Sequence, residues 1–287
     1  MALICAIYGY EFTREFGYEG MKFVPRYSYV VDANKKARDL KKYQLTGIVI
    51  LDEYQQRTVF CLEAVLSFIE HLDVLISDPV EVAVADTKQE YFSLFPEVAR
   101  TSMRHSGGGA ILHQDSYFPA MRSSFITIAM SRLADEQFCK STGWDVLFFK
   151  TTETFRQRHQ FVEVSYFLLF SGLETYVRQT LNVPTSPSSP PISSLIAKQL
   201  GKLGFNIKEY DEDDLTRSAD TYARLRNALF HNSSMQAQRK KKNGAVVNYS
   251  LLNYYVNFKI LLSLVVIRAA GYNDHSINLD TWITMQT

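Results

Sequence analysis

One short string late in the chain carries the side chains with the clearest chemical potential. Arg226, Asn227 and His231 stand in the sequence Arg-Asn-Ala-Leu-Phe-His. In a helix, Asn227 and His231 are four residues apart and lie on one face. Arg226 lies about 140° around the helix from His231 and about 7.5 Å along its axis. The two side chains can therefore meet only if the arginine curls around the helix, or if two copies of the helix come together in a symmetric dimer.

An arginine and a histidine that converge on one phosphodiester could cleave RNA. His231 could act as general base on a ribose 2′-hydroxyl, or as general acid on the 5′-oxygen leaving group. Arg226 could stabilise the charge that develops on the phosphoryl oxygens, and Asn227 could orient the phosphate or the histidine. RNA supplies its own nucleophile, so this chemistry requires neither a metal ion nor a cofactor, and we expect neither.

The string and its surroundings resemble the HEPN superfamily, whose mark is an Arg followed by a polar residue, a short spacer and a His. Residues 169–177 (LFSGLETYV) also resemble the first long helix of the HEPN branch found at the C-terminus of ApeA-like anti-phage proteins, and Leu173-Glu174 matches the Leu-Glu pair of that branch. The resemblance covers about residues 151–271. It departs from the pattern at Asn232, where many relatives have Gly.

The HEPN resemblance implies a fold, an activity and a partner. Members of the family form a helical bundle that dimerises and places two Arg/His sets in a shared cleft. Active members are metal-independent endoribonucleases of phage defence, toxin–antitoxin pairs and RNA processing. We therefore expect a homodimer that cleaves RNA, with transfer RNA as one substrate to test. Its setting would be antiviral defence by abortive infection, or a toxin role.

Two other interpretations stay open at this point. The bundle could be a non-catalytic HEPN-like module that dimerises and binds RNA or a protein. It could also be an unrelated helical bundle, in which Arg226 pairs at the surface with the acidic residues 209–214 and His231 caps the helix. An intact Arg226/His231 pair favours catalysis, because a scaffold needs neither side chain.

Two further features could support the site. Glu174 falls within a mostly apolar helix, and a buried carboxylate needs a partner. Arg226 is the candidate, either as a group that Glu174 orients or as one half of a structural ion pair; an exposed position for Glu174 is the alternative. The run Arg239, Lys240, Lys241 and Lys242 could hold RNA phosphates, although a solvated loop is the usual structure for such a run.

The elements that must position these residues are helical in the second half of the chain. Apolar periodicity predicts helices at residues 154–181, 193–203, 215–231 and 250–270. Asp213 or Asp214 would cap the third helix, and Gly271 would end the fourth. The Pro- and Ser-rich residues 185–191 predict a loop. The region therefore reads as an all-α bundle of four to five helices.

The first half of the chain reads as mixed strand and helix. Short runs rich in Val, Ile, Tyr and Phe predict strands at residues 3–8, 27–31, 46–51, 80–85 and 125–130. Residues 57–76 carry apolar positions at helical spacing. The fold class is therefore α+β, with one domain at residues 1–147 and a HEPN-like bundle at residues 148–287. The first domain would sense or regulate, and would meet a regulatory partner or a phage trigger.

Composition and charge limit the remaining classes. Apolar residues make up 46% and charged residues 21% of the chain, which excludes bulk disorder. Residues 1–147 hold 15 Lys+Arg and 19 Asp+Glu, whereas residues 148–287 hold 16 and 11. The second half is therefore the more basic and the better suited to RNA. Three scattered cysteines argue against a disulfide framework. The short apolar stretches predict neither a secretory signal nor a membrane span, so we expect a cytoplasmic location.

Overall fold

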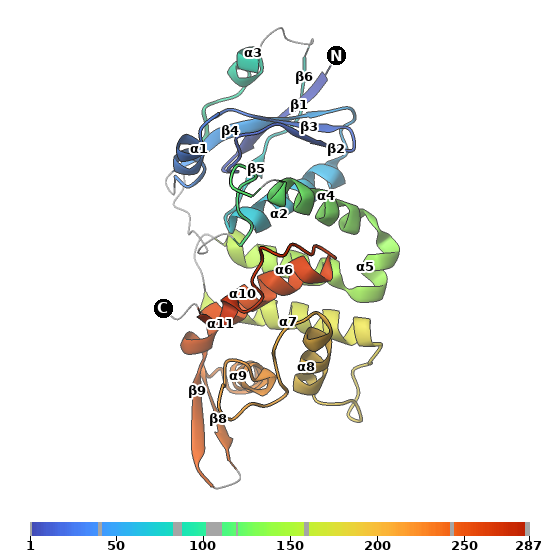
Figure 1. The fold of residues 1–287 in the computed structure, drawn as a ribbon, viewed down its shortest axis with the longest axis vertical. Coiled ribbons are helices and arrows are strands. Elements are labelled where there is room, and N and C mark those ends of the chain that lie inside the picture. Colours follow the sequence, from blue (N-terminus) through green and yellow to red (C-terminus); the bar gives the residue numbers. More distant parts are fainter. Residues whose placement is uncertain are drawn as a thin grey trace. The chain divides into compact units, whose positions relative to one another are not determined.

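The chain forms two compact units in a computed structural model, which describes residues 2–39, 42–82, 88–101, 111–118, 120–157, 161–241 and 244–284 (Figure 1). Unit 1 comprises Met1–Ala134 and Phe155–His159, and unit 2 comprises Asp135–Thr154 and Gln160–Thr287. The boundary that the sequence suggested, between residues 147 and 148, falls inside the helix Trp144–Arg156. The α+β fold class is confirmed: an antiparallel sheet with helices is followed by a largely helical region.

Unit 1 is built on an antiparallel sheet whose strands differ in length. Its order is β2-β3-β4-β1-β5, with β6 also pairing with β1 and β7 with β4. The two central strands, β4 and β1, are buried along most of their length. The strands are β1 (Ala2–Tyr8), β2 (Phe16–Tyr18), β3 (Met21–Pro25), β4 (Lys42–Leu51), β5 (Leu75–Ile76), β6 (Val80–Val82) and β7 (Val98–Thr101).

Four helices belong to the described part of unit 1: α1 (Val30–Ala37), α2 (Gln56–Glu70), α3 (Lys88–Ser93) and α4 (Met121–Ala134). α2 and α4 lie on one face of the sheet (Figure 1). The rings of Phe68 on α2 and Phe125 on α4 stack with centroids 5.5 Å apart, so aromatic packing joins these two helices.

Two predicted strands of unit 1 are wrong. Residues 125–130 lie inside α4, and α1 begins at Val30 within the predicted strand 27–31. A short apolar run does not by itself distinguish a buried strand from a buried helix. In α4 the buried residues Met121, Phe125 and Ala129 recur at four-residue spacing, a period that the short window 125–130 did not reveal.

Unit 2 is largely helical and also contains a hairpin that the sequence did not predict. The hairpin strands β8 (Gln236–Lys240) and β9 (Val246–Ser250) pair antiparallel, and β8 lies beside α9 (Figure 1). Gly244 has a φ of 86° near the tip, a conformation that favours glycine. The helices are α5 (Glu136–Thr142), α6 (Trp144–Arg156), α7 (Val162–Leu181), α8 (Ile192–Lys202), α9 (Ala219–Asn232), α10 (Leu251–Ala269) and α11 (Thr281–Thr284).

α10 is the apolar centre of unit 2. Its length and mean hydropathy of 1.4 would suffice to cross a bilayer, but 72% of its most apolar stretch is buried inside the fold. The indole N–H of Trp144 on α6 donates to the carbonyl of Val266 at 3.0 Å. The ring of Phe258 packs 4.8 Å from that of Tyr222 on α9. Burial of this kind is typical of the central helix of a folded unit.

Two helix boundaries in unit 2 differ from the prediction. The predicted helix 154–181 is two helices, since α6 ends at Arg156 and α7 begins at Val162. The third helix begins at Ala219 rather than after Asp213 or Asp214. Asp214 instead accepts hydrogen bonds from the backbone N–H groups of Thr216 and Arg217, so it closes a local turn before the helix.

Candidate functional site

The Arg-Asn-Ala-Leu-Phe-His string lies in the last two turns of α9, where none of its residues is fully buried. Tyr222, Ala223 and Leu225 are buried and fix the orientation of the helix. The hydroxyl of Tyr166 on α7 donates to the carbonyl of Tyr222 at 2.8 Å. The helix ends at Asn232, and Ser233 takes the left-handed conformation with a φ of 50°. This left-handed cap position, which favours glycine, is occupied here by a serine.

Arg226 is held against α7 by two acceptors. Its Nη2 donates to Oε2 of Glu174 at 3.0 Å, and its Nη1 donates to Oδ1 of Asn227 at 3.0 Å. Its guanidinium carbon lies 5.6 Å from the ring centroid of Phe170 and 5.7 Å from that of Phe230. The guanidinium is thus fixed in direction by hydrogen bonds and by the faces of two aromatic rings.

Glu174 is a partly buried carboxylate with two arginine partners. Besides Arg226, Arg178 donates from Nε to Oε1 at 2.9 Å. The side chain of Glu174 is 19% exposed, so it is neither an exposed edge residue nor an unpaired buried charge. The pairing of Arg226 with Glu174 rather than with residues 209–214 removes one premise of the unrelated-bundle interpretation.

Asn227 and His231 lie together in a different place. Both line an open groove of about 520 Å³ between α9 and the strand β8. His231 is exposed, and its ring packs edge-on against that of Phe230 with centroids 5.1 Å apart. No contact among the described residues joins Arg226 to His231 directly. Asn227 accepts from Arg226 and lines the same groove as the histidine.

The predicted basic run is only partly available for RNA. Arg239 forms an ion pair with Asp220, and its guanidinium carbon lies 3.3 Å from the ring centroid of Tyr210. Arg239 therefore has a structural role in attaching β8 to the helices. Lys240 is exposed and Lys241 is half-buried near the hairpin tip. Lys242 lies outside the described residues.

An exposed apolar face adjoins Arg226. Phe167 on α7 and Phe230 on α9 are 42% and 60% exposed, and their rings stack at 6.1 Å with an interplanar angle of 10°. Phe161 and Val164, also exposed, continue this face along the first turns of α7. We call Phe161, Val164, Phe167 and Phe230 the aromatic face. Apolar surface of this kind on a folded unit commonly marks an interaction site.

Within the ranges that the structure describes, no three His, Cys, Asp or Glu side chains are grouped to hold an ion. Cys5, Cys61 and Cys139 are free thiols.

Comparisons with family models, with curated proteins and with solved structures found no match to this chain.

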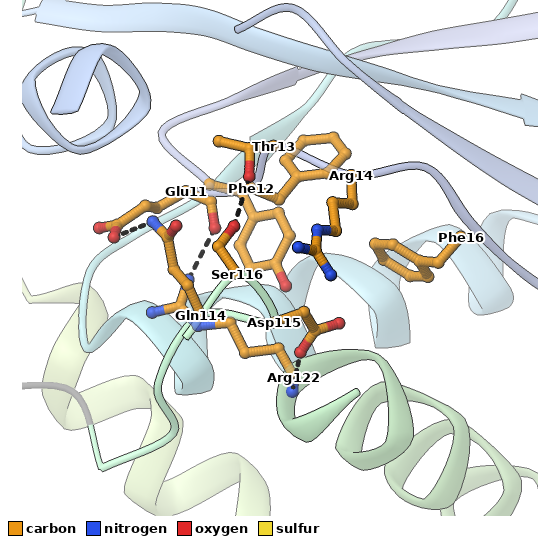
Figure 2. Close-up of a pocket in the computed structure, with 10 residues that line it drawn as sticks. Glu11, Phe12, Thr13, Arg14, Phe16, Gln114, Asp115, Ser116 and Arg122 are labelled. Atoms are coloured by element: carbon orange, nitrogen blue, oxygen red, sulfur yellow. Dashed lines mark hydrogen bonds between the residues drawn. The ribbon is translucent and has the colours of Figure 1, made fainter. Parts of the chain in front are cut away.

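Unit 1 holds a separate polar cluster that the sequence did not reveal. Arg122 of α4 and Glu70 of α2 form an ion pair at 2.7 Å with both side chains buried. Arg122 also donates to the carbonyl of Glu11 at 2.7 Å, and Gln114 donates to the Glu11 carboxylate. Figure 2 shows Glu11, Gln114 and Arg122 brought together from three segments. Burial, together with the nearby Glu70 carboxylate, raises the pKa of Glu11 to about 7.

The raised pKa predicts that unit 1 loses stability as pH rises. Folding favours the protonated form of Glu11, so this contribution is complete below about pH 4.5 and is lost by about pH 7. Glu11→Gln, which cannot ionise, should remove this part of the pH dependence. Urea unfolding of both proteins by far-ultraviolet circular dichroism should give a wild-type midpoint that falls relative to the variant across this range. Urea midpoints that change with pH in the same way in both proteins would contradict the raised pKa of Glu11.

Proposed function

We propose that unit 2 is a metal-independent endoribonuclease of HEPN type that works as a homodimer. The observation that carries the proposal is the arrangement of four side chains on α7 and α9. Glu174 holds Arg226, Arg226 bonds to Asn227, and Asn227 shares an open groove with the exposed His231. The set supplies a fixed positive charge, a polar connector and a titratable group of the kind that general acid–base catalysis uses.

The reaction follows from the groups present. His231 accepts the proton of a ribose 2′-hydroxyl, whose oxygen then bonds to the adjacent phosphorus. The bond from phosphorus to the 5′-oxygen breaks, and that oxygen takes the proton that His231 has accepted. The products are a 2′,3′-cyclic phosphate and a 5′-hydroxyl. Arg226 stabilises the charge on the phosphoryl oxygens. Because Oδ1 of Asn227 accepts from Arg226, its amide N–H groups are left to donate to the phosphate.

The homodimer accounts for the separation of Arg226 from His231. Within one chain Arg226 points to α7, whereas His231 lines the groove beside β8. The aromatic face lies next to both residues, since Phe230 contacts the guanidinium of Arg226 and the ring of His231. A second copy docked on this face would bring the Arg226 of one chain toward the His231 of the other, in the isologous manner of a twofold dimer.

Phe167→Asp should break this dimer. A buried charge without a partner at the centre of an interface is strongly unfavourable, and loss of a central aromatic contact raises a dissociation constant by about thirtyfold or more. Light scattering after size-exclusion chromatography should show a dimer for the wild type and a monomer for the variant. Leu252→Asp, which changes an exposed residue of α10, is the matched control and should stay dimeric. A dimeric Phe167→Asp would exclude the aromatic face as the interface.

The biological role follows from the resemblance and from the presence of unit 1. We propose an antiviral or toxin role in the cytoplasm, in which cleavage of host or viral RNA, with transfer RNA as a first substrate to test, stops growth. Unit 1 would sense a phage trigger or bind a regulatory partner.

One observation favours a second function, a non-catalytic module that dimerises and binds RNA or protein. Arg226 and His231 do not touch within one chain, and the contacts of Arg226 are also those of a structural ion pair. In that case the aromatic face and the groove would be binding surfaces alone.

Incubation of the purified full-length protein with total RNA and transfer RNA in EDTA separates the two functions. The endoribonuclease proposal predicts discrete fragments with the wild type and none with His231→Ala. RNA that is bound by both proteins and cut by neither would favour the binding module.

A further inference from the structure

The groove that holds His231 is lined by one arginine, Arg224, which is not part of the Arg-Asn-Ala-Leu-Phe-His string. Arg224, Asn227 and His231 recur at spacings of three and four residues, so all three lie on one face of α9. All three line the groove, whereas Arg226 does not. The guanidinium that shares a surface with His231 within one chain is therefore that of Arg224.

The charge around Arg224 is not balanced. Arg224 donates from Nε to Oδ2 of Asp220 at 2.6 Å, and Arg239 pairs with the same oxygen. Two guanidinium groups thus share one carboxylate. Arg239 is also covered by the ring of Tyr210, but the Arg224 side chain is 39% exposed. The excess positive charge is consequently presented to solvent at Arg224.

The rest of the groove is neutral and rich in hydrogen-bonding groups. Its other lining residues are Ala228 and Asn232 of α9 and Ser234, Gln236, Ala237 and Gln238 of the adjoining segment. None of them is acidic or aromatic. One arginine among amides and a hydroxyl can bind a phosphate and donate to or accept from the edges of bases. A protein partner with an apolar anchor would find no matching surface here.

We propose that Arg224 binds a phosphate of single-stranded RNA in the groove between α9 and β8, beside Asn227 and His231. The inference deepens the proposed function, since it takes RNA to be the ligand of this surface. Arg224 acts in binding, and Arg226 keeps its place next to Glu174. A nucleotide whose phosphate contacts Arg224 lies in the same groove as the imidazole of His231, which would act on that nucleotide.

Fluorescence anisotropy at several salt concentrations tests the proposal. The probe is a fluorescein-labelled 2′-O-methyl RNA, which cannot be cut by 2′-hydroxyl attack. Arg224→Gln in the full-length protein should weaken binding about tenfold and reduce the salt slope by about one. Arg224→Lys should keep most of the slope because it keeps the charge. Arg217→Gln, which alters an arginine of unit 2 bonded to Asp214, is the control and should bind like the wild type.

The outcomes separate this inference from the proposed function. An unchanged affinity and salt slope in Arg224→Gln would overturn the role of Arg224, even if His231→Ala abolished cleavage. Weakened binding in Arg224→Gln would support it, even if the wild type cut no RNA and the proposed catalysis failed. Absence of binding by the wild type would overturn the inference. Circular dichroism of each variant excludes misfolding, and Arg224→Lys keeps the test valid if Arg224→Gln does not fold.

Discussion

His231→Ala should lower the rate of RNA cleavage by about 10²–10⁴-fold, the usual contribution of a positioned general acid–base group. The fold should be unaffected, because His231 is exposed in the last turn of α9 and packs only edge-on against Phe230 among its described contacts. Single-turnover cleavage of a labelled RNA in EDTA measures the loss. Circular dichroism and the unfolding midpoint should match those of the wild type.

His275→Ala is the matched control for His231→Ala. His275 is also an exposed histidine of unit 2 but lies outside the groove, so its replacement should leave the rate unchanged. Equal cleavage by wild type and His231→Ala would place the activity at another site or in a contaminant. Equal losses in both histidine variants would show that the effect is not specific to the groove.

The second large effect should come from Arg226→Gln. Removal of a preorganised donor to a developing oxyanion costs about 10²–10³ in kcat, and Asn227 would also lose the guanidinium that orients its amide. Arg178→Gln is the control, because it removes the other partner of Glu174 and leaves Arg226 bonded. The rate should fall in Arg226→Gln alone. A comparable loss in Arg178→Gln would mean that both arginines act through the stability of α7.

Mixing two inactive variants tests whether the site is shared between copies. In a symmetric dimer, His231→Ala and Arg226→Gln chains that exchange freely form half heterodimers, and each heterodimer has one complete site. Activity should return to about a quarter of the wild-type rate. Mixtures that stay inactive after subunit exchange would show that Arg226 and His231 act within one chain, or that they do not act together.

Parts of the site could be predicted from sequence because they depend on helical spacing alone. A separation of four residues put Asn227 and His231 on one face, and both line the groove. The rotation of about 140° separated Arg226 from His231, and their contacts are indeed different. Glu174 needed a partner because its helix is mostly apolar, and Arg226 supplies one at 3.0 Å.

Arg224 could have been found by the same spacing, but its significance depends on β8. The strand Gln236–Lys240 is polar or basic along most of its length, so it lacks the apolar alternation by which strands are recognised. Pairing with Val246–Ser250 forms it, and this is a tertiary effect. Without β8 there is no groove wall, and Arg224 reads as an ordinary helix-surface residue.

The misplaced elements have local physical causes. The sequence predicts Asp213 or Asp214 as the cap of the third helix, but the carboxylate of Asp214 accepts from the backbone N–H groups of Thr216 and Arg217 and pairs with Arg217, which stabilises a turn instead. The cluster around Arg122 and Glu70 was missed because its members lie far apart in the chain. Only the packing of α2 against α4 brings these two charges together.

The chemistry of the product ends tests the central claim most directly. Wild-type protein in EDTA should convert an all-RNA oligonucleotide into fragments that end in a 2′,3′-cyclic phosphate and a 5′-hydroxyl, as read by mass spectrometry. A single 2′-deoxy substitution at the cut position should abolish cleavage there, because the internal nucleophile is gone. Fragments with 5′-phosphate ends, or cutting at the 2′-deoxy position, would contradict 2′-hydroxyl attack and with it the roles proposed for His231 and Arg226.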